Sequence, residues 1–305
     1  MLRFTLTRLG WAVTTLLVVL SFVFFLARLS GDPVRLMLPY QATQAQVEAM
    51  RHALGFDRPM LEQYAGFIGG ALSGDVGMSL RQRRPALAVV LERLPATLSL
   101  AVPSFAIGFA MALGLALLGE ITRSVRLRTA LLWLATLRQS IPPYLFGILL
   151  VLGLSVKLAL LPAMGRAGPA SYVIPLLTMS TFEIALYLRL LNAAFDETRR
   201  LDWVRMARAK GVSQSRLVIR HILPNALLPL ITVGGINLGV LLGGTVVLEM
   251  VFNWPGMGRL IIQGVTQRDY PIVQAGVVVT ATMFILINVV VDVLYAVLDP
   301  RVRLG

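Results

Sequence analysis

Six long apolar runs constrain this chain more than any other feature. They lie at residues 9–29, 96–118, 131–154, 172–191, 226–251 and 272–298. A helix needs about 20 apolar residues to cross a bilayer, and in lipid a helix satisfies its own backbone hydrogen bonds. The sequence therefore predicts an all-α, polytopic membrane protein in which six transmembrane helices form a single domain over residues 1–305. The first run is longer than the apolar core of a signal peptide, so we expect a retained anchor.

Composition supports a membrane protein and narrows its chemistry. Charged residues make up 14% of the chain and hydrophobic residues 57%, whereas about 25% of the residues in a soluble domain are charged. The chain has no cysteine, which excludes disulfides and thiolate metal ligands, and its two histidines, His52 and His221, are far apart. We therefore expect no metal ion and no cofactor bound by this chain.

The basic residues predict the orientation in the membrane. The net charge is +13, and Lys and Arg accumulate in the cytoplasmic loops of membrane proteins. With the N-terminus inside, eight basic residues fall in the cytoplasmic segment 189–220, whereas the two short outer loops contain Lys157, Arg166, Arg259 and Arg268. Both termini are therefore predicted to be cytoplasmic. Because the charges lie between apolar runs, we attribute them to topology in the lipid membrane and not to nucleic-acid binding.

Residues 30–95 are predicted to form an ordered helical cap outside the membrane. Thr43 and Gln46 have the spacing of a capping box, which opens a short helix that ends at Gly55. Residues 60–72 have the pattern of a second, amphipathic helix. Pro85 is placed to start a third helix, which leads into residues 94–97.

The loop at residues 194–225 is unusually basic for a segment between two apolar runs. Its central part, residues 202–211, has an amphipathic pattern and predicts a short helix. Asp202 is placed to cap the N-terminus of that helix, and Gly211 allows the positive φ with which a chain reverses after a helix. From the residues alone, the loop is either an ordinary positive-inside loop or a surface for a partner.

The loop resembles the cytoplasmic signature of the inner-membrane permease subunits of ATP-binding-cassette (ABC) importers. That signature has a Glu-Ala-Ala triplet, a glycine four positions after it, and an Ile-x-Leu-Pro ending. The matching residues here are Ala207, Gly211, Leu223 and Pro224, while Arg205 and Met206 replace Glu and Ala, and His221 replaces Ile. Such an Ala-Arg-Ala-Lys-Gly version is common in the peptide branch of the family.

The resemblance extends over nearly the whole chain. Its segments occur in the same order as in the dipeptide, oligopeptide and nickel branch of the family, and they are similar to the first of the two permeases in such systems. The matching segments are 54–59, 63–64, 74–79 and 94–98 before the second run, 140–142 and 161–162 around the third, 249–252, 254–258 and 268–271 before the last, and 299–301 at the end. The resemblance implies the type I importer permease fold and a place in the bacterial cytoplasmic membrane.

In such importers a short helix of this loop docks in a cleft of the ATPase subunit and couples ATP hydrolysis to the transmembrane helices. The resemblance assigns that coupling role here to Asp202, Arg205, Met206, Ala207, Arg208, Lys210, Gly211, Leu223 and Pro224. Val204, Met206 and Ala207 are expected to offer apolar contact to the ATPase, and the basic residues are expected to offer charge.

The energy source is expected to lie outside this chain. The sequence has no Gly-x-x-x-x-Gly-Lys-Ser/Thr phosphate-binding loop, so the chain is predicted to be a non-catalytic subunit. The resemblance implies two cytoplasmic ATPase subunits that bind ATP and magnesium, a paralogous second permease, and an extracytoplasmic substrate-binding protein. The outer cap, with Trp254-Pro255-Gly256, is the expected docking surface for that binding protein.

Charged residues within the apolar runs are candidates for the pathway, because they are costly in lipid. They are Glu183, Arg138 and Asp292. Glu183 is hypothesised to face the translocation cavity and to meet a peptide amino terminus or a cation, or else to form a structural ion pair with Arg138 or Arg189. Small residues at four-residue spacing in the fifth run predict close helix packing, within the chain or with the second permease, and they are Gly235, Gly239 and Gly243.

The predicted function is the ATP-driven import of di- and oligopeptides. An importer of nickel or a metal chelate from the same family is the first alternative, and a secondary transporter or channel is the second. An intramembrane enzyme is disfavoured, because His52 is predicted outside and His221 in the cytoplasmic loop, so that no Ser–His pair shares a site.

Overall fold

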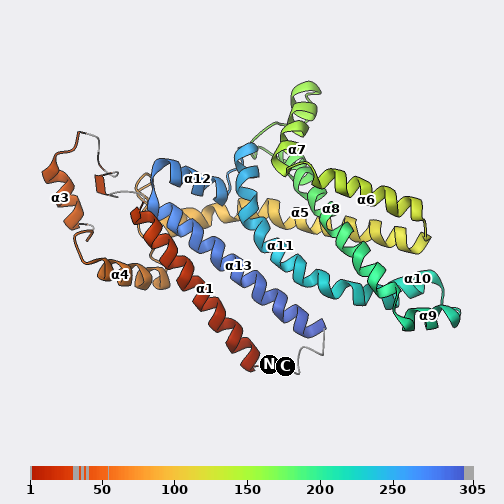
Figure 1. Ribbon diagram of the computed structural model, residues 1–305. Helices are drawn as coiled ribbons and strands as arrows, with labels where there is room; N and C mark the ends of the chain where they lie inside the picture. The colour runs from red at the N-terminus through yellow and green to blue at the C-terminus, as the bar shows by residue number, and fades with distance from the viewer. Residues whose placement is uncertain (1, 30–33, 36–37, 39–40, 54, 299–305) are drawn as a thin grey trace. The chain divides into compact units, whose positions relative to one another are not determined.

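The computed structural model describes residues 2–29, 34–35, 38, 41–53 and 55–298 (Figure 1). These residues are predominantly helical, and the one β feature found among them is an isolated bridge between Met78 and Pro85. The main elements are α1 (Leu2–Leu29), α3 (Gln44–Ala53), α4 (Met60–Ser73), α5 (Ala86–Thr122), α6 (Val125–Gln139), α7 (Pro143–Leu150), η1 (Val151–Lys157), η2 (Pro169–Tyr172), α8 (Val173–Arg199), α9 (Asp202–Ala209), α10 (Gln214–Leu217), η3 (Val218–Ile222), α11 (Leu223–Val251), α12 (Met257–Gln267) and α13 (Tyr270–Leu298).

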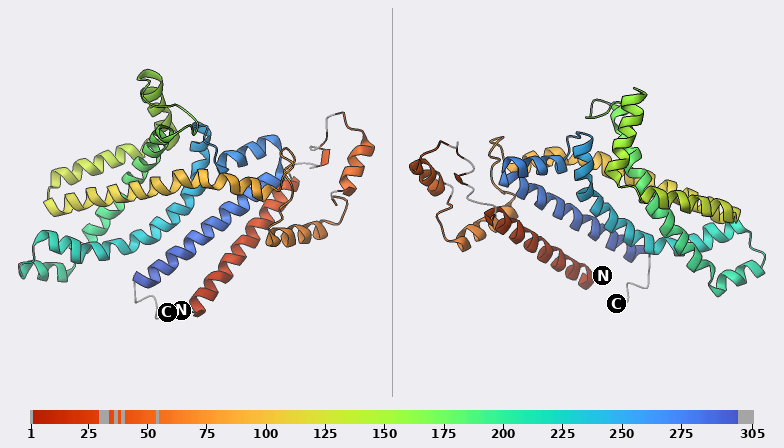
Figure 2. Two further views of the ribbon diagram at one scale, coloured as in Figure 1. Left: turned by 180° about the vertical axis from the view of Figure 1, so that it is seen from behind. Right: turned by 45° about the horizontal axis from the view of Figure 1, so that its top comes forward.

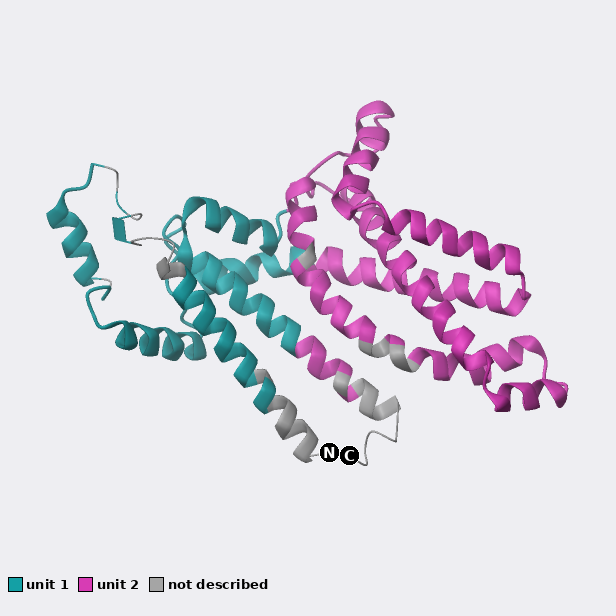
Figure 3. Cartoon of the chain, in the orientation of Figure 1, with its two compact units in different colours: residues 1–97, 255–285 teal, residues 98–254, 286–305 magenta. Residues whose placement is uncertain are grey.

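Contacts along the chain divide it into two compact units (Figure 3). Unit 1 contains residues 1–97 and 255–285, and unit 2 contains residues 98–254 and 286–305. The long helices α5 and α13 each contribute residues to both units.

In unit 1, α1 packs against α4 through aromatic side chains. Phe24 is fully buried, and its ring meets the Tyr64 ring edge to face, with the centroids 5.3 Å apart. The Phe67 ring also lies against the Phe24 ring. The hydroxyl groups of Ser21 and Tyr64 share a hydrogen bond of 2.7 Å. A polar link of this kind between helices fixes their register, because an unpaired hydroxyl in an apolar contact is costly.

The first two helices of the predicted cap form as expected. The capping box at α3 is confirmed, because the Thr43 amide donates to Gln46 Oε1 at 2.9 Å and the Gln46 amide donates to Thr43 Oγ1 at 3.4 Å. The helix ends before Gly55, which has a φ of +70°, and α4 ends at Gly74, which has a φ of +83°. Both glycines occupy the left-handed conformation that ends helices at low cost.

The third cap helix does not exist as a separate element. The helix that follows Pro85 continues without interruption through Pro95 to Thr122 as α5, which makes it 37 residues long. Its first turns join α12 and α13 in the core of unit 1, where Val90, Met257 and Ala275 are buried together. Separate propensity signals before and after residue 95 therefore belong to one helix.

The core of unit 2 surrounds α8. Tyr187, Leu191 and Phe195 on this helix are fully buried against Ala112 of α5 and Val204 of α9. The helices α6, α7 and α11 each pack against α8 (Figure 2). A central helix that is apolar on most of its circumference is typical of a buried position in a bundle.

Three of the six predicted spans are single helices that are long and apolar enough to cross a membrane: Ala86–Thr122, Pro169–Arg199 and Tyr270–Val291. Up to two more are formed by bent helix pairs, Val125–Gln139 with Pro143–Lys157 and Val233–Gly243 with Thr245–Val251. Within α1, which has 28 residues, the described side chains include the apolar stretch Val13–Leu26. The described residues thus contain three to five spans by length and composition.

The run predicted as the third span, at 131–154, is not one continuous helix. Helix α6 ends at Gln139, and the axis turns by 94° before the next helix starts at Pro143. Pro142 and Pro143 lack backbone N–H donors, and each restricts the residue before it to extended conformations. The double proline was visible in the sequence, and it is the physical reason for the break.

Candidate functional site

The cytoplasmic loop predicted at residues 194–225 folds into the short helix α9, followed by α10 and the π-helical turn η3. Leu201 is the N-cap of α9, in an extended conformation without a side-chain cap, and Asp202 is the first helical residue. Asp202 therefore does not cap the helix as predicted. Its carboxylate lies in the first turn, where a negative charge interacts favourably with the positive end of the helix dipole. The carboxylate also forms an ion pair with Arg205 at 3.6 Å.

The C-terminus of α9 is closed by a Schellman motif centred on Gly211. The Gly211 amide donates to the Arg208 carbonyl at 3.0 Å, and the Val212 amide donates to the Ala207 carbonyl at 3.2 Å. Gly211 has a φ of +75°, so the predicted positive φ is confirmed. Val212 and Ala207 both pack on the core of unit 2.

The two faces of α9 have different surroundings. Val204 is fully buried in the core and Ala207 packs against it, so these two residues hold the helix on its own subunit. The expectation that Val204 contacts a partner is therefore wrong. On the other face, Met206 is 58% exposed and the Arg205 side chain is 74% exposed. Together with the exposed Lys210, they form a basic surface with an apolar centre.

Leu223 and Pro224 begin α11, directly after η3. Leu223 packs against the same core as Ala207, whereas Pro224 is exposed in the first turn of the helix. Proline is well tolerated there, because the first turn has no partner for its missing N–H. The Leu-Pro pair thus defines how the loop returns to the fifth apolar run.

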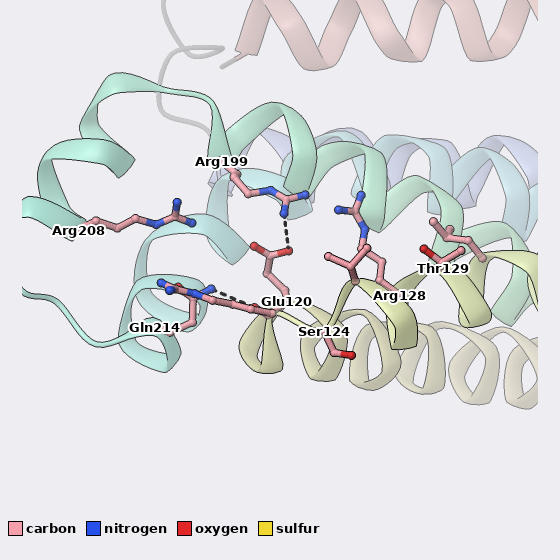
Figure 4. A pocket seen from close by; sticks show the side chains of 11 residues that line it. Glu120, Ser124, Arg128, Thr129, Arg199, Arg208 and Gln214 are labelled. Carbon is pink, nitrogen blue, oxygen red and sulfur yellow. Dashed lines mark hydrogen bonds and ion pairs between the residues drawn. The ribbon is translucent and has the colours of Figure 1, made fainter.

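A polar network lies between the loop and the ends of α5, α6 and α8 (Figure 4). Arg199 pairs with the buried Glu120 at 3.7 Å and also with Asp196, which pairs in turn with Arg128. Gln214 of α10 donates to the Glu120 carbonyl at 3.0 Å. Sequence reasoning missed Glu120, Asp196 and Arg128. The one signal available was that arginines and carboxylates occur together in the segments that flank the apolar runs.

Arg208 is exposed on α9 and also lines a cavity of about 490 Å³ beside this network (Figure 4). The other side chains that define the cavity are Glu120, Arg123, Ser124, Val125, Arg128, Thr129, Leu132, Arg199 and Gln214. The coupling role of Arg208 therefore stays a prediction.

Glu183 is 3% exposed on α8 and lines a second, largely apolar cavity of about 260 Å³. The Asn237 side-chain amide donates to Glu183 Oε2 at 2.5 Å and to the Tyr187 hydroxyl at 3.0 Å. Gly108 of α5 lies directly against the Glu183 side chain, where a Cβ would collide with it. Among the described residues, the ion pairs do not include Glu183, so its polar partner is Asn237 and not Arg138 or Arg189.

Arg138 lies at the 94° bend, and its side chain is hydrogen-bonded to backbone carbonyls of the same chain. Its guanidinium donates to the Ile141 carbonyl at 3.0 Å and to the Thr178 carbonyl at 2.8 Å, while Nε donates to Thr181 Oγ1 at 2.9 Å. Its Cζ lies 4.0 Å from the ring centroid of Phe146. The side chain joins the end of α6, the start of α7 and the middle of α8, which indicates a clamp at the bend.

The glycines of α11 differ in their surroundings. A Cβ at Gly235 would collide with Val291 of α13, so this glycine serves packing within the chain. Gly239 is buried, whereas a Cβ at Gly243 would meet nothing within 4 Å. The side chain of the third pathway candidate, Asp292, lies outside the described side chains.

Trp254 is fully buried and meets Tyr172 edge to face, with the ring centroids 4.7 Å apart. The expectation that this tryptophan belongs to an external docking surface is therefore wrong. The indole ring packs instead against side chains of its own chain, Tyr172 and Arg166.

Comparison with known proteins gives matches over the full length. A family described as "Binding-protein-dependent transport system inner membrane component" matches residues 116–304, and its N-terminal companion family matches residues 1–101. The chain is 39% identical to the glutathione transport system permease protein GsiC of Escherichia coli strain K12, with 99% of each chain covered. The protein of the same name from Shigella flexneri is 38% identical, again over 99% of each chain.

A solved structure of the MetNI methionine ABC transporter in an inward-facing conformation is similar in fold. The TM-score is 0.56 at 18% identity, and the match covers 70% of this chain and 98% of that chain.

Proposed function

Because this chain belongs to the family of binding-protein-dependent transport system inner membrane components, and is thus an inner-membrane permease of the ABC importer type, we propose that it carries short peptides into the cell. It forms half of the pathway, and a paralogous second permease forms the other half. Two cytoplasmic ATPases bind ATP and magnesium and supply the energy. An extracytoplasmic binding protein delivers the substrate.

The observation that carries the substrate class is the full-length match to permeases named for glutathione. Glutathione is a tripeptide, with one ammonium group, two carboxylates and two amide bonds. A permease that resembles its transporters at 39% identity over 99% of the chain suits substrates of that size and charge. Short peptides are therefore the proposed cargo, with glutathione-like tripeptides included.

The chemistry around Glu183 supports this class. The Glu183 carboxylate is 3% exposed, accepts a hydrogen bond from Asn237 and lines a largely apolar cavity of about 260 Å³. Ionisable groups inside membrane helices are functional candidates, since they are costly to keep there. The ammonium of a peptide amino terminus is a cation of suitable size to pair with Glu183 as the substrate passes.

The exposed face of α9 is proposed to dock on the ATPase. Met206 offers an apolar anchor, while Arg205 and Lys210 offer charge to an acidic surface. The opposite face is fixed by the buried Val204, so a displacement of α9 is transmitted to α8 through the same core. Gly211 and Pro224 set the two turns through which the loop leaves α9 and enters α11.

The proposed topology has six spans with both termini in the cytoplasm, with α1 as the first span and the bent pair α6 and α7 as the third. In this orientation α9 faces the cytoplasm, and α3 and α4 lie outside the membrane, where the binding protein docks. The open space at Gly243 is suited to a helix of the second permease.

The experiment is ATP hydrolysis by the importer purified through a tag on this chain and supplied with its binding protein. Di- and tripeptides, glutathione, nickel and nickel chelates are compared as stimulants. We expect stimulation by peptides. Stimulation by nickel or its chelates alone would replace the peptide assignment, and a tagged chain that arrives without ATPases would contradict the coupling role of α9.

A further inference from the structure

The cavity of about 490 Å³ between α5, α6, α8 and α10 is lined by four arginines, Arg123, Arg128, Arg199 and Arg208, of which Figure 4 labels the last three. Arg128 and Arg199 are held in place by carboxylates, through Asp196 and Glu120. All of these residues belong to unit 2, and the network is internally connected. The cavity is therefore a preformed pocket whose basic side chains are oriented before any ligand arrives.

The charge of the pocket is not balanced by the protein. Four guanidinium groups and one carboxylate, that of Glu120, line the pocket, and Asp196 pairs with Arg128 and Arg199 from outside the lining. With both carboxylates counted, two positive charges are left. Among the described residues, no ion pair is found for Arg123 or Arg208. Arg123 is instead oriented by Gln214, whose Oε1 accepts from its Nη2 at 2.6 Å. The pocket is thus suited to an anion that carries one to two charges.

Arg123 is held at a conformational cost. It has a φ of +53°, in the left-handed region that residues other than Gly, Asn and Asp rarely adopt. It is the turn residue between α5 and α6, where a glycine would be cheaper. Ser124, the next residue, caps α6 by accepting from the Leu127 amide at 3.2 Å. The turn therefore holds a guanidinium beside the positive end of a helix dipole, and both attract an anion.

The lining also includes two apolar side chains of α6, Val125 and Leu132, and Val125 is 77% exposed. The same helix carries the exposed Trp133, Leu134 and Leu137 farther along. Basic side chains next to exposed apolar side chains on a membrane helix suit a headgroup with its acyl chain, whereas a free anion gains nothing from the apolar side chains.

We propose that this pocket binds the phosphate group of an anionic membrane lipid at the cytoplasmic face, with the acyl chain along α6. The proposal rests on the orientation given under the proposed function. Basic pockets between membrane helices on the cytoplasmic side bind anionic headgroups by this charge chemistry. A lipid held here joins the ends of α5, α6 and α8 next to the loop that contains α9.

The test measures lipid binding to the importer purified through a tag on this chain, by native mass spectrometry during titration with phosphatidylglycerol or phosphatidylcholine. The key variant is Arg123→Asn, because asparagine tolerates the left-handed conformation and the variant should fold. Each arginine near an anionic surface contributes to the binding free energy, and the loss of one should weaken phosphatidylglycerol binding about fivefold. Phosphatidylcholine binding should not change.

Arg126→Gln is the matched control, because it removes the same charge from the first turn of α6 but does not line the pocket. It should bind phosphatidylglycerol like the wild type. Equal weakening by both variants, or by neither, would overturn the proposal in favour of diffuse surface charge. Size-exclusion profiles and thermal unfolding of both variants verify folding.

Two further arms separate the sources of the anion. Millimolar inorganic phosphate should not displace phosphatidylglycerol, and displacement would assign the pocket to a free phosphate. If Arg123→Asn keeps its lipid but loses the ATPase subunits, the pocket receives an acidic side chain of the partner, and the lipid proposal is refuted. Lipid binding is measured without substrate, so a failed peptide assignment leaves this test unaffected.

Discussion

Substitution of Gly211 changes the end of α9 without changing any packing contact. A Cβ at this position would meet nothing within 4 Å, while its φ of +75° is unfavourable for side chains. The effect of a substitution therefore comes from the left-handed conformation alone. Alanine in this region costs about 1–2 kcal/mol, and part of that is offset by about 0.4–1 kcal/mol because alanine restricts the unfolded chain. The net cost is about 1 kcal/mol.

A cost of about 1 kcal/mol corresponds to about a fivefold change in the equilibrium constant between the closed and the open end of the helix. We expect Gly211→Asn to lose little, Gly211→Ala to reduce substrate-stimulated ATP hydrolysis several-fold, and Gly211→Val to lose most of it. The order follows the tolerance of these residues for positive φ. The assay compares basal and stimulated hydrolysis in the reconstituted importer, with thermal unfolding measured in parallel.

Gly165→Ala is the matched control for Gly211→Ala. Gly165 has a φ of +85°, and a Cβ there would also meet nothing within 4 Å, but it lies outside the cytoplasmic loop. It should lower thermal stability to a similar degree and leave coupling intact. If Gly165→Ala uncouples the importer equally, or if Gly211→Asn is as harmful as Gly211→Val, the Schellman turn is not the cause.

Glu183→Gln keeps an oxygen for Asn237 but removes the negative charge. The stimulation of ATP hydrolysis by peptides with a free amino terminus should therefore fall toward the stimulation by N-acetylated peptides. An unchanged ratio of the two stimulations would exclude the ammonium contact. Arg138→Gln removes three hydrogen bonds at the bend. At about 0.6 kcal/mol each in a membrane, their loss should lower the free energy of unfolding, measured with denaturant, by about 2 kcal/mol. A loss of transport without destabilisation would instead indicate a pathway role. Gly235→Ala should cost about 1–3 kcal/mol because its Cβ collides with Val291, whereas Gly243→Ala should be tolerated in the isolated chain; equal thermal stabilities would contradict this packing.

Much of the local structure was predictable, because its causes lie within a few residues. The capping box at Thr43 and Gln46 needs a spacing of three, and the positive φ at Gly211 needs the absence of a Cβ. The apolar runs also identify the long helices, since their signal is the length of each run. The residues that match the permease family are likewise a property of the sequence.

The sequence alone determined that this chain is a helical membrane protein with a helix in the loop at 194–225, because those properties follow from local pattern and composition. Only the tertiary structure decided which side of α9 is buried, since Val204 and Met206 are both apolar and the core of α5, α8 and η3 selects one of them. It also decided that Arg138 clamps a bend and that Glu120 lies beside Arg199, because these neighbours are distant in sequence. A contact between remote residues depends on how helices pack, which no local pattern records.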